Sequence, residues 1–394
     1  MEMCASKKKA VVIGGSNGIG FSIVKKLVDK DYQVVIVDKV KPDDEEYVND
    51  NNCEYVHSNL LYFDEELFLD LSSDKTIDTL MLTAGFGRVT NFENLHISEI
   101  ENSFRVNTIA LLKVISLFYD RIKSNDTFYC GVMCSIAGCI SSPKFSVYAS
   151  TKAALWRFVE SVNAELQSEN YTNRILNVSP GSIKGTKFNG APFNQEELTS
   201  QLAEEILSNL YARNLLYIPE YETIFKGVIE RYNKDSIGFG LESYKYKQES
   251  GRNDDEKKVK IGYLSGTFDL FHVGHLNLLR RAKEQCDYLI VGIHPDAKHK
   301  GKVAFIPYEE RKEIVSCCKY VDKVVKSCLE DSDAWEKWHY NRLFVGSDYK
   351  GTERFNKYES YFKDKGVEIV YFPYTTSTSS TQIREKIIKD KCEL

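Results

Sequence analysis

Short apolar runs rich in β-branched residues alternate with longer helix-like stretches along most of this chain. In the first part such runs lie at residues 10–13, 33–37, 79–82 and 127–133. Strands that alternate with helical patterns are typical of βαβ units, in which each crossover helix covers a parallel sheet. The alternation therefore predicts an α/β fold built on a parallel sheet.

The alternation stops once and then begins again. Residues 241–258, LESYKYKQESGRNDDEKK, are polar and dense in charge, which is typical of a linker. New strand-like runs follow at residues 259–264, 288–293, 323–325, 342–345 and 368–371. We therefore expect two tandem Rossmann-like α/β domains with parallel sheets, at residues 1–240 and 259–394, joined by a linker at 241–258.

Composition excludes several other classes of protein. With 42% hydrophobic residues the chain can bury ordinary cores, and its net charge of −5 argues against a generally basic nucleic-acid binder. No apolar run is long enough to span a membrane, and the lysines at 7–9 lead directly into a strand rather than into a signal sequence. We expect a cytoplasmic protein, with no membrane partner, whose ten scattered cysteines are reduced.

A glycine-rich turn follows the first predicted strand. The sequence IGGSNGIG places Gly14, Gly18 and Gly20 between that strand and an amphipathic helix. Glycines allow a pyrophosphate to approach the backbone, and the helix N-terminus offers free N–H groups. A tight turn without a ligand is the alternative.

An acidic residue ends the second predicted strand. Asp38 lies about 20 residues after the glycines, where a carboxylate can accept hydrogen bonds from the ribose diol of a dinucleotide. The carboxylate would repel a 2′-phosphate, which favours NADH over NADPH. Lys39 has the opposite effect, so NAD(P)H is the expected cofactor with its phosphorylation state open.

A serine, a tyrosine and a lysine follow further along the chain. Tyr148 and Lys152 are four residues apart and so share a helix face, where the ammonium lowers the pKa of the phenol from about 10. Such a phenol can donate a proton near neutral pH. Ser135 precedes this pair.

The segment from about Lys8 to Lys187 resembles the short-chain dehydrogenase/reductase family. The resemblance rests on Ser135, Tyr148 and Lys152, together with the glycine turn, the TAG segment at 83–85, Asn107, and Pro180-Gly181 before Thr186. The resemblance implies that Tyr148 is the general acid, Ser135 orients a carbonyl, Lys152 binds the nicotinamide ribose and Asn107 holds a proton-relay water. The implied cofactor contacts are Gly14, Ser16, Asn17, Gly18, Ile19, Gly20, Asp38, Ala84, Gly85, Tyr148, Lys152, Pro180, Gly181 and Thr186.

Two positions depart from the family pattern. Ile13 stands where a threonine is usual, and Thr83 stands where an asparagine is common. Both affect contacts that support the cofactor rather than the reacting groups. A dinucleotide-sensing module without catalysis is the alternative. Candidates for gripping an anionic substrate are Arg88, Lys144, Lys184 and Lys187, each of which could equally be a solvated surface charge.

Two histidines follow the first strand of the second part, in SGTFDLFHVGH. His272 and His275 converge at the start of the next helix, where imidazoles and helix N–H groups can stabilise charge on a phosphate under attack. A zinc site is the alternative, but no further ligands at the required spacing accompany the pair, so we predict no metal bound directly by the protein.

Residues 259–386 resemble the cytidylyltransferases that act on glycerol phosphate, phosphocholine or phosphoethanolamine. The resemblance rests on the histidine motif and on Lys300 in HKGK, Arg311 in YEERKEIV, VGSD and STSSTQIRE. The resemblance implies Mg²⁺ with CTP. It implies CTP contacts at Gly266, Thr267, Phe268, His272, His275, Lys300, Lys302, Arg311, Asp348, Ser379, Ser380 and Thr381.

The resemblance is incomplete near the C-terminus. Tyr374 replaces an arginine that is usual in the glycerol phosphate enzymes. Lys350 and Arg354 in KGTERF could supply the missing charge, or could simply begin an exposed helix. Trp335 and Trp338 are spaced as helix core residues. Structural or surface roles are expected for the remaining histidines, His57, His96, His294, His299 and His339.

The two halves predict one function together. The first would reduce a ketose phosphate to an alditol phosphate with NAD(P)H, and the second would join CMP from CTP to that product, giving a CDP-alditol for a capsule or other surface polysaccharide. Two unrelated activities are one alternative. A reductase-like regulatory or oligomerising module on a cytidylyltransferase is another. Only small-molecule substrates are expected as partners, and the resemblances imply a homo-oligomer.

Overall fold

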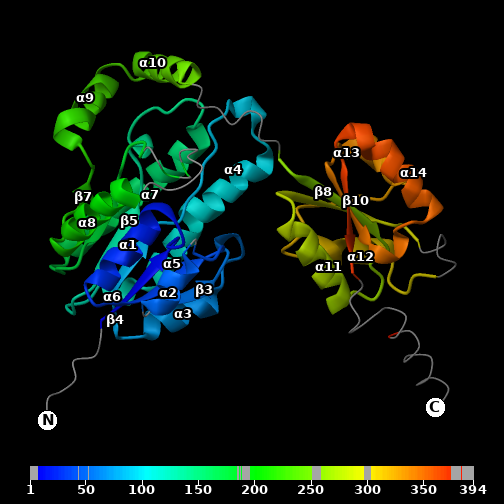
Figure 1. The fold of residues 1–394 in the computed structure, drawn as a ribbon, viewed down its shortest axis with the longest axis horizontal. Coiled ribbons are helices and arrows are strands. Elements are labelled where there is room, and N and C mark those ends of the chain that lie inside the picture. Colours follow the sequence, from blue (N-terminus) through cyan, green and yellow to red (C-terminus); the bar gives the residue numbers. More distant parts are fainter. Residues whose placement is uncertain are drawn as a thin grey trace, which may run out of the picture. The chain divides into compact units, whose positions relative to one another are not determined.

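The computed structural model divides the chain into two compact units, Met1–Glu256 and Lys257–Leu394 (Figure 1). It describes residues 8–42, 44–51, 53–183, 186, 188, 196–250, 259–296, 303–373 and 383. Each unit is built around its own sheet and its own hydrophobic core. Two domains were expected, and each is described separately below.

The first sheet has seven parallel strands (Figure 1). In spatial order they are β3 (Cys53–His57), β2 (Gln33–Asp38), β1 (Lys9–Ile13), β4 (Ile77–Leu82), β5 (Tyr129–Met133), β6 (Ile175–Val178) and β7 (Leu216–Tyr217). The chain runs outward from β1 in one direction and then returns to start β4 on its other side. This reversal lies between β1 and β4, and ligands of open α/β sheets bind beyond the carboxyl ends of the strands at such a point.

Helices cover both faces of this sheet because side chains alternate along each strand. Val11 and Ile13 of β1 face a core shared with α3 (Glu65–Ser73), α5 (Leu111–Leu117) and α7 (Ser146–Ser168). Ala10 and Val12 face the opposite core, shared with α1 (Gly18–Asp29), α2 (Glu45–Asp50) and α8 (Glu196–Tyr211). The shorter helices α4 (Ile97–Phe104) and α6 (Tyr119–Ile122) complete the first face.

The predicted linker needs a correction at its start. Helices α9 (Lys226–Lys234) and α10 (Ser236–Glu249) end the first unit, so residues 241–249 are helical rather than part of a linker. Lys247 of α10 donates hydrogen bonds to Ser142 Oγ and to the Pro143 carbonyl, both at 2.8 Å. The segment looked like coil because α10 is largely exposed and its charges lie at helix spacing, as in the Lys245–Glu249 pair.

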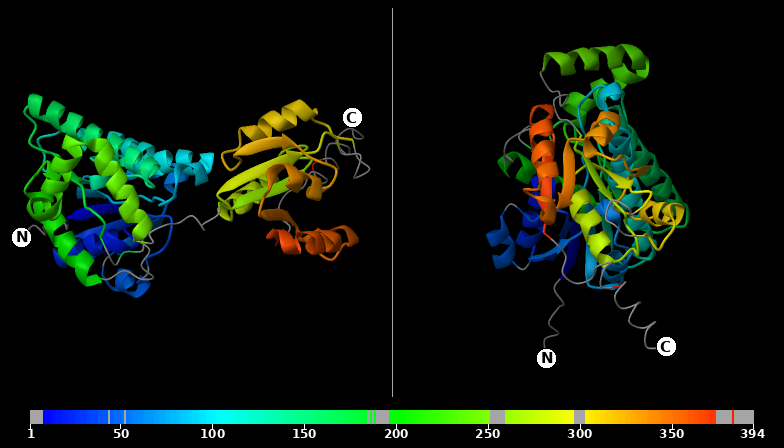
Figure 2. Two further views of the ribbon diagram at one scale, coloured as in Figure 1. Left: turned by 90° about the horizontal axis from the view of Figure 1, so that it is seen from above. Right: turned by 90° about the vertical axis from the view of Figure 1, so that its right-hand side faces the viewer.

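The second sheet has five parallel strands with the same kind of reversal. Their order is β10 (Lys323–Lys326), β9 (Tyr288–Ile293), β8 (Ile261–Gly266), β11 (Arg342–Gly346) and β12 (Glu368–Phe372). Helices α11 (Val273–Glu284) and α12 (Tyr308–Ser316) cover one face, and α13 (Asp331–Trp338) and α14 (Glu353–Phe362) cover the other (Figure 2). Here the switch point lies between β8 and β11.

The predicted fold class of two parallel-sheet α/β domains is therefore confirmed. The sequence patterns missed β3, β6 and the two-residue β7. Trp335 and Trp338 pack against the core beneath α13, as their spacing predicted. The eight cysteines among the described residues are all free. No helix in the described ranges is long and apolar enough to cross a membrane.

Two candidate active sites

The glycine turn of the first domain is packed too closely for side chains. Gly14 has a left-handed φ of 83°, and a Cβ there would lie 2.5 Å from the Ala84 nitrogen. A Cβ on Gly20 would collide with the Gly14 carbonyl. The Thr83 hydroxyl donates to the carbonyls of Ile13 (2.8 Å) and Gly14 (3.0 Å), so this departure from the family pattern fastens β4 to the turn.

Helix α1 begins at this turn with its N-terminus open. The N-cap Asn17 makes no side-chain capping bond, and the first turn contains no acidic residue. Free N–H groups and the positive end of the helix dipole therefore face the turn, as an anion site requires. The residues present fit a pyrophosphate group.

Asp38 lies beside the same turn, at the carboxyl end of β2. Its carboxylate accepts hydrogen bonds from the backbone N–H groups of Ser16 at 3.1 Å and Lys39 at 2.7 Å. Ser16 is itself held by a hydrogen bond from its hydroxyl to the Val40 carbonyl. These bonds fix the carboxylate next to the place where the glycines admit a dinucleotide.

Asn107, Gly85 and Lys152 converge beyond β4. Asn107 is buried in the π-helical turn η3 (Arg105–Ala110), and its amide exchanges hydrogen bonds with the backbone of Phe86 and donates to Thr151 Oγ1. A Cβ on Gly85 would lie 3.2 Å from Lys152 Nζ and 3.5 Å from Asn107 Oδ1. The structure thus brings together three residues that are far apart in the sequence.

Lys152 is 2% exposed and donates a hydrogen bond to the Met133 carbonyl at 2.7 Å. Burial lowers the pKa of its ammonium from 10.5 to about 8, because desolvation disfavours the charged form. Its Nζ lies 5.8 Å from the ring centre of Tyr148, one helical turn earlier on α7. The predicted pairing of Tyr148 and Lys152 on one helix face is therefore present.

Tyr148 lies on α7, and Ser135 lies directly before the short helix that follows β5. The Tyr148 ring is 8% exposed and stacks on Phe145 at 4.2 Å, in a small buried cluster against which Ala137 packs. Ser135 begins the short helix η4 (Ile136–Gly138), where its Oγ accepts from the Ala137 N–H at 3.2 Å. Ala137 thus donates to Ser135 and packs against the cluster that contains Tyr148.

The predicted residues after β6 flank this group. The Pro180 carbonyl accepts from the Ile136 N–H, next to Ser135. Gly181 lies directly against the Phe225 ring, a neighbour that the sequence patterns did not reveal. Thr186 is buried and donates to the Ile183 carbonyl. Lys184 and Lys187 lie outside the described residues.

The two remaining candidates for anion binding differ. Both Arg88 and Lys144 line a small pocket in front of Tyr148. Arg88 donates to both carboxylate oxygens of Glu99, at 2.9 and 3.0 Å, so its charge is already neutralised by the protein. Lys144 is 8% exposed, and its Nζ lies 5.5 Å from the ring centre of Tyr244 in α10.

In the second domain the loop after β8 is held in an unusual backbone conformation. Phe268 (φ 52°) and Leu270 (φ 49°) are both left-handed, which is costly for bulky residues and is often found at functional sites. Gly266 lies against the Phe268 ring, and the Phe268 and His275 ring centres are 5.2 Å apart. The Thr267 hydroxyl is buried and makes no hydrogen bond within the described part of the chain, so it is available to a ligand.

The two histidines stack at the start of α11. Their ring centres are 4.1 Å apart, and His272 Nδ1 accepts the Gly274 N–H at 3.0 Å as the N-cap of the helix. An accepting Nδ1 leaves Nε2 as the protonated nitrogen of a neutral ring. Burial lowers the pKa of His272, which also favours the neutral form near pH 7. Its Nε2–H can therefore donate to a phosphate oxygen.

Arg311 supports the loops and does not line an open surface. It is 1% exposed and donates to the carbonyls of Thr267, His294, Pro295 and Ile306. Burial lowers its pKa. The sequence predicted a CTP contact here, and the geometry gives Arg311 a scaffolding role through the Thr267 carbonyl.

Asp269 is a second support that the motif analysis passed over. Its carboxylate, 4% exposed, accepts the backbone N–H groups of Phe305 and Ile306 at 2.9–3.1 Å. It ties the loop after β8 to the segment before α12. The one sequence feature that could have indicated this role is that Asp269 is the single acidic residue of SGTFDLFHVGH.

The other predicted CTP contacts divide into two groups. Asp348 lies in the turn after β11, beside Gly346, on the other side of the switch point from the histidines. Lys300, Lys302, Ser379, Ser380 and Thr381 lie outside the described residues, as does Tyr374.

The KGTERF segment begins α14. Its arginine, Arg354, forms an ion pair with Glu330 and donates to the Leu329 carbonyl, which favours a structural role. Lys350 remains as the cation beside β12, 5.6 Å from the Tyr371 ring centre. Within the part of the chain that is described, no group of three histidine, cysteine or acidic side chains could hold a metal ion.

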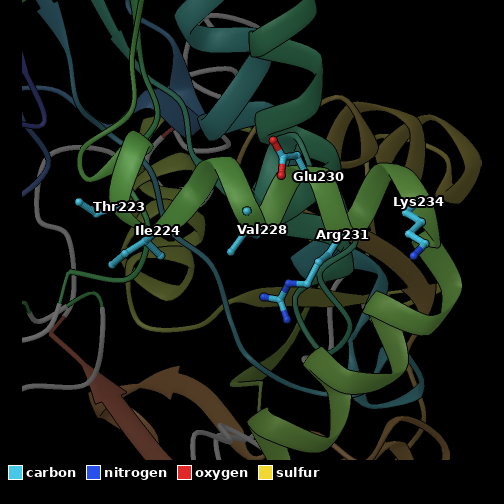
Figure 3. Close-up of a pocket in the computed structure, with 7 residues that line it drawn as sticks. Thr223, Ile224, Val228, Glu230, Arg231 and Lys234 are labelled. Atoms are coloured by element: carbon cyan, nitrogen blue, oxygen red, sulfur yellow. The ribbon is translucent and has the colours of Figure 1, made fainter.

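An open hollow elsewhere on the first domain contains none of the predicted site residues. It is lined by Thr223, Ile224, Gly227, Val228, Glu230, Arg231 and Lys234 (Figure 3). All of these residues come from the turn η6 (Tyr221–Phe225) and from α9. We therefore place the two candidate sites at the switch points and not here.

Comparison with known proteins assigns both domains. Residues 8–197 match the model of the short chain dehydrogenase family, and residues 263–386 match the cytidylyltransferase-like family. The chain is 36% identical over 126 residues to a glycerol-3-phosphate cytidylyltransferase of Staphylococcus aureus, covering 31% of this chain and 90% of that protein.

The first domain has relatives of its own. A probable short-chain type dehydrogenase/reductase of Helicobacter pylori is 29% identical over 208 residues, covering 50% of this chain and 73% of that protein. A solved short chain dehydrogenase/reductase from Burkholderia phymatum, in complex with NAD, has a TM-score of 0.50 at 15% identity and covers 58% of this chain and 94% of that one. The latter likeness concerns the fold alone.

Proposed function

We propose a function that follows from one premise: the chain belongs to the short-chain dehydrogenase/reductase family in its first domain and to the cytidylyltransferase family in its second. It is therefore an oxidoreductase joined to a nucleotidyltransferase. The proposal is that the two reactions are consecutive. A ketose phosphate with five or six carbons is reduced to an alditol phosphate, which then displaces pyrophosphate from CTP and becomes a CDP-alditol.

In the reduction, the chain's own residues supply the proton and the orientation. Tyr148 donates its phenolic proton to the carbonyl oxygen as the carbon accepts a hydride, while Ser135 donates a hydrogen bond to the same oxygen. Lys152 keeps positive charge beside the phenol, and Asn107 fixes the turn that follows β4. NAD(P)H, when bound, supplies the hydride.

We propose NADH as the preferred reductant. The Asp38 carboxylate accepts hydrogen bonds from the backbone N–H groups of Ser16, Lys39 and Val40 beside the glycine turn, where it can accept the two hydroxyls of an adenosine ribose. A 2′-phosphate at that place would meet the same negative charge. Lys39 is exposed and is the residue that works against this preference.

In the transfer, the alditol phosphate oxygen bonds to the α-phosphorus of CTP and the bond to the pyrophosphate breaks. His272 and His275 are placed to donate to the oxygens of that phosphorus, where negative charge increases. The Thr267 hydroxyl and the α11 N-terminus add further donors. We expect Mg²⁺ to accompany the triphosphate, with no ligand from the protein.

One observation supports the coupling: a single chain has Tyr148 and Lys152 on one face of α7 and the stacked pair His272 and His275 at the start of α11. A product that is an alcohol and a phosphate is the acceptor that the second reaction needs. We further infer that the enzyme acts in the cytoplasm as a homo-oligomer and that its product serves a surface polysaccharide.

The test is a coupled assay on the whole chain. The protein is incubated with NADH or NADPH, CTP and Mg²⁺, and with ribulose 5-phosphate, fructose 6-phosphate or dihydroxyacetone phosphate in turn. We expect oxidation of the reductant and release of pyrophosphate with the five- or six-carbon substrate, and NADH to be used more efficiently.

The outcomes separate the alternatives. If none of the ketose phosphates oxidises either reductant, the coupled reaction is wrong. Pyrophosphate release with ribitol 5-phosphate or glycerol 3-phosphate alone would then leave a cytidylyltransferase with a regulatory or oligomerising first domain. Reduction of a substrate whose product does not release pyrophosphate would indicate two unrelated activities.

A further inference from the structure

One cation on the wall of the Tyr148 pocket has no role in the chemistry above. Lys144 lines this pocket and is 8% exposed. No carboxylate among the described residues forms an ion pair with it, whereas Arg88 on the same wall is neutralised by Glu99. An anionic ligand in this pocket would therefore pair with a charge that the described residues leave unbalanced.

The backbone presents Lys144 in an unfavourable conformation. Its φ of 60° is left-handed, a region in which a residue with a long side chain is strained. The Lys144 carbonyl accepts the Thr90 N–H at 2.7 Å, which holds the turn against that strain. The surroundings therefore fix a lysine where glycine or asparagine would be the easier choice.

Helix α10 places a second ammonium at the same turn. Lys247 donates to Ser142 Oγ and to the Pro143 carbonyl at 2.8 Å. Its Nζ lies 6.0 Å from the ring centre of Phe145, and Phe145 stacks on Tyr148. Two lysines thus meet at residues 142–145, immediately before α7: Lys144 belongs to this segment, and Lys247 binds it from α10.

We propose that Lys144 binds the phosphate group of the ketose phosphate, with Lys247 adding to the local positive potential. In this arrangement the phosphate contacts Lys144 while the carbonyl lies at Tyr148 and Ser135. This proposal rests on the proposed function and deepens it, since it names the residue that selects a phosphorylated substrate. It also makes α10, which supplies Tyr244 beside Lys144, one wall of the reductase site.

The test compares phosphorylated and free ketoses. Initial rates with NADH are measured on the full chain for ribulose 5-phosphate and fructose 6-phosphate, and for ribulose and fructose. Lys144→Gln should raise the KM of the ketose phosphates by about 10- to 100-fold, the range expected for a charge-assisted hydrogen bond, with little change in kcat. The kinetics of the free ketoses should not change, and Lys144→Arg should retain most of the affinity.

A control variant removes a lysine charge from α10, the helix whose Tyr244 contacts Lys144. Lys245 on α10 is exposed and pairs only with Glu249 among the contacts described, so Lys245→Gln should leave every KM unchanged. If Lys144→Gln leaves the KM of the ketose phosphates unchanged, or raises the KM of free and phosphorylated ketoses alike, Lys144 only fastens α10 through Tyr244 and the proposal is wrong.

A binding measurement keeps this test independent of the reaction. Inorganic phosphate is titrated by calorimetry into the full chain with NAD⁺ and with excess CTP, which occupies the second domain. Wild type should bind phosphate at least tenfold more tightly than Lys144→Gln. If this difference is present but no ketose phosphate is reduced, the proposed substrate is wrong and the anion site stands. Equal binding by both proteins would refute the site itself.

Discussion

Each domain buries a cation within its candidate site, and the two cations do different work. Lys152 donates to the single carbonyl of Met133, and burial lowers its pKa to about 8. Arg311 donates to four backbone carbonyls from three separate segments and is 1% exposed. With one carbonyl acceptor, the Lys152 ammonium can still bind other groups, whereas the Arg311 guanidinium uses its donors to hold loops together.

The largest effect expected from this contrast is on catalysis. Lys152→Met should reduce the rate of ketone reduction by about 10²- to 10⁴-fold, because the charge that supports the Tyr148 proton donor is lost. The free energy of unfolding should change little, since an apolar side chain replaces a desolvated charge. The measurements are steady-state reduction and thermal unfolding. A large loss of stability would mean that Lys152 is a structural cation like Arg311.

The converse change should act on stability. Arg311→Met leaves four carbonyls without their donor and should destabilise the second domain by about 3–5 kcal/mol. Pyrophosphate release should fall with it, while reduction by the first domain continues. Chemical denaturation followed with both activities tests this. An Arg311→Met protein that unfolds like wild type but has lost CTP affinity would assign Arg311 to the ligand.

The two sites should also differ in their response to pH. Lys152 is protonated below its folded pKa of about 8, so kcat/KM for reduction should be constant below that pH and fall by about tenfold per unit above it. Between about pH 8 and 10.5 the folded protein binds fewer protons at Lys152 than the unfolded chain does. The free energy of unfolding should therefore increase with pH in this range, because the cost of burying the Lys152 charge disappears. Pyrophosphate release should show no decline near pH 8, because His272 is already neutral there. Parallel profiles for both activities would contradict the assignment.

The smallest effect is expected at Thr83, whose hydroxyl, like the Arg311 side chain, donates hydrogen bonds to backbone carbonyls. Thr83→Val removes two hydrogen bonds to the glycine turn and should cost about 1 kcal/mol of cofactor binding. The KM for NADH should rise about fivefold with kcat nearly unchanged. Thr83→Ser keeps the hydroxyl and serves as the control. An unchanged KM in Thr83→Val would show that the turn holds its shape without this contact.

The sequence predicted what is local and contiguous. Gly14, Asp38 and the pair of His272 and His275 stand directly after strands, so strand patterns and short motifs were enough to place them at the sheet edges. Tyr148 and Lys152 were paired correctly because helix spacing alone determines their shared face.

Features that depend on several distant segments could not be predicted in this way. The role of Arg311 depends on carbonyls of three segments that only the folded loops bring together. The packing of α10 depends on Lys247 reaching residues about 100 positions earlier, and its exposed, charged sequence looks like coil. Strand β7, with two residues, is too short to show any periodicity.

Helix α10 also limits how such an enzyme can be assembled from parts. A recombination point near residue 240, where the change in composition invites one, would separate Tyr244 and Lys247 from the reductase whose pocket they adjoin. A chimaera that exchanges the transferase there would keep both sets of predicted reacting residues and lose the contacts that α10 makes with residues 142–144. Domain exchange that preserves reduction should therefore join the genes beyond Glu249, so the functional boundary of the reductase lies at least nine residues later than its composition indicates.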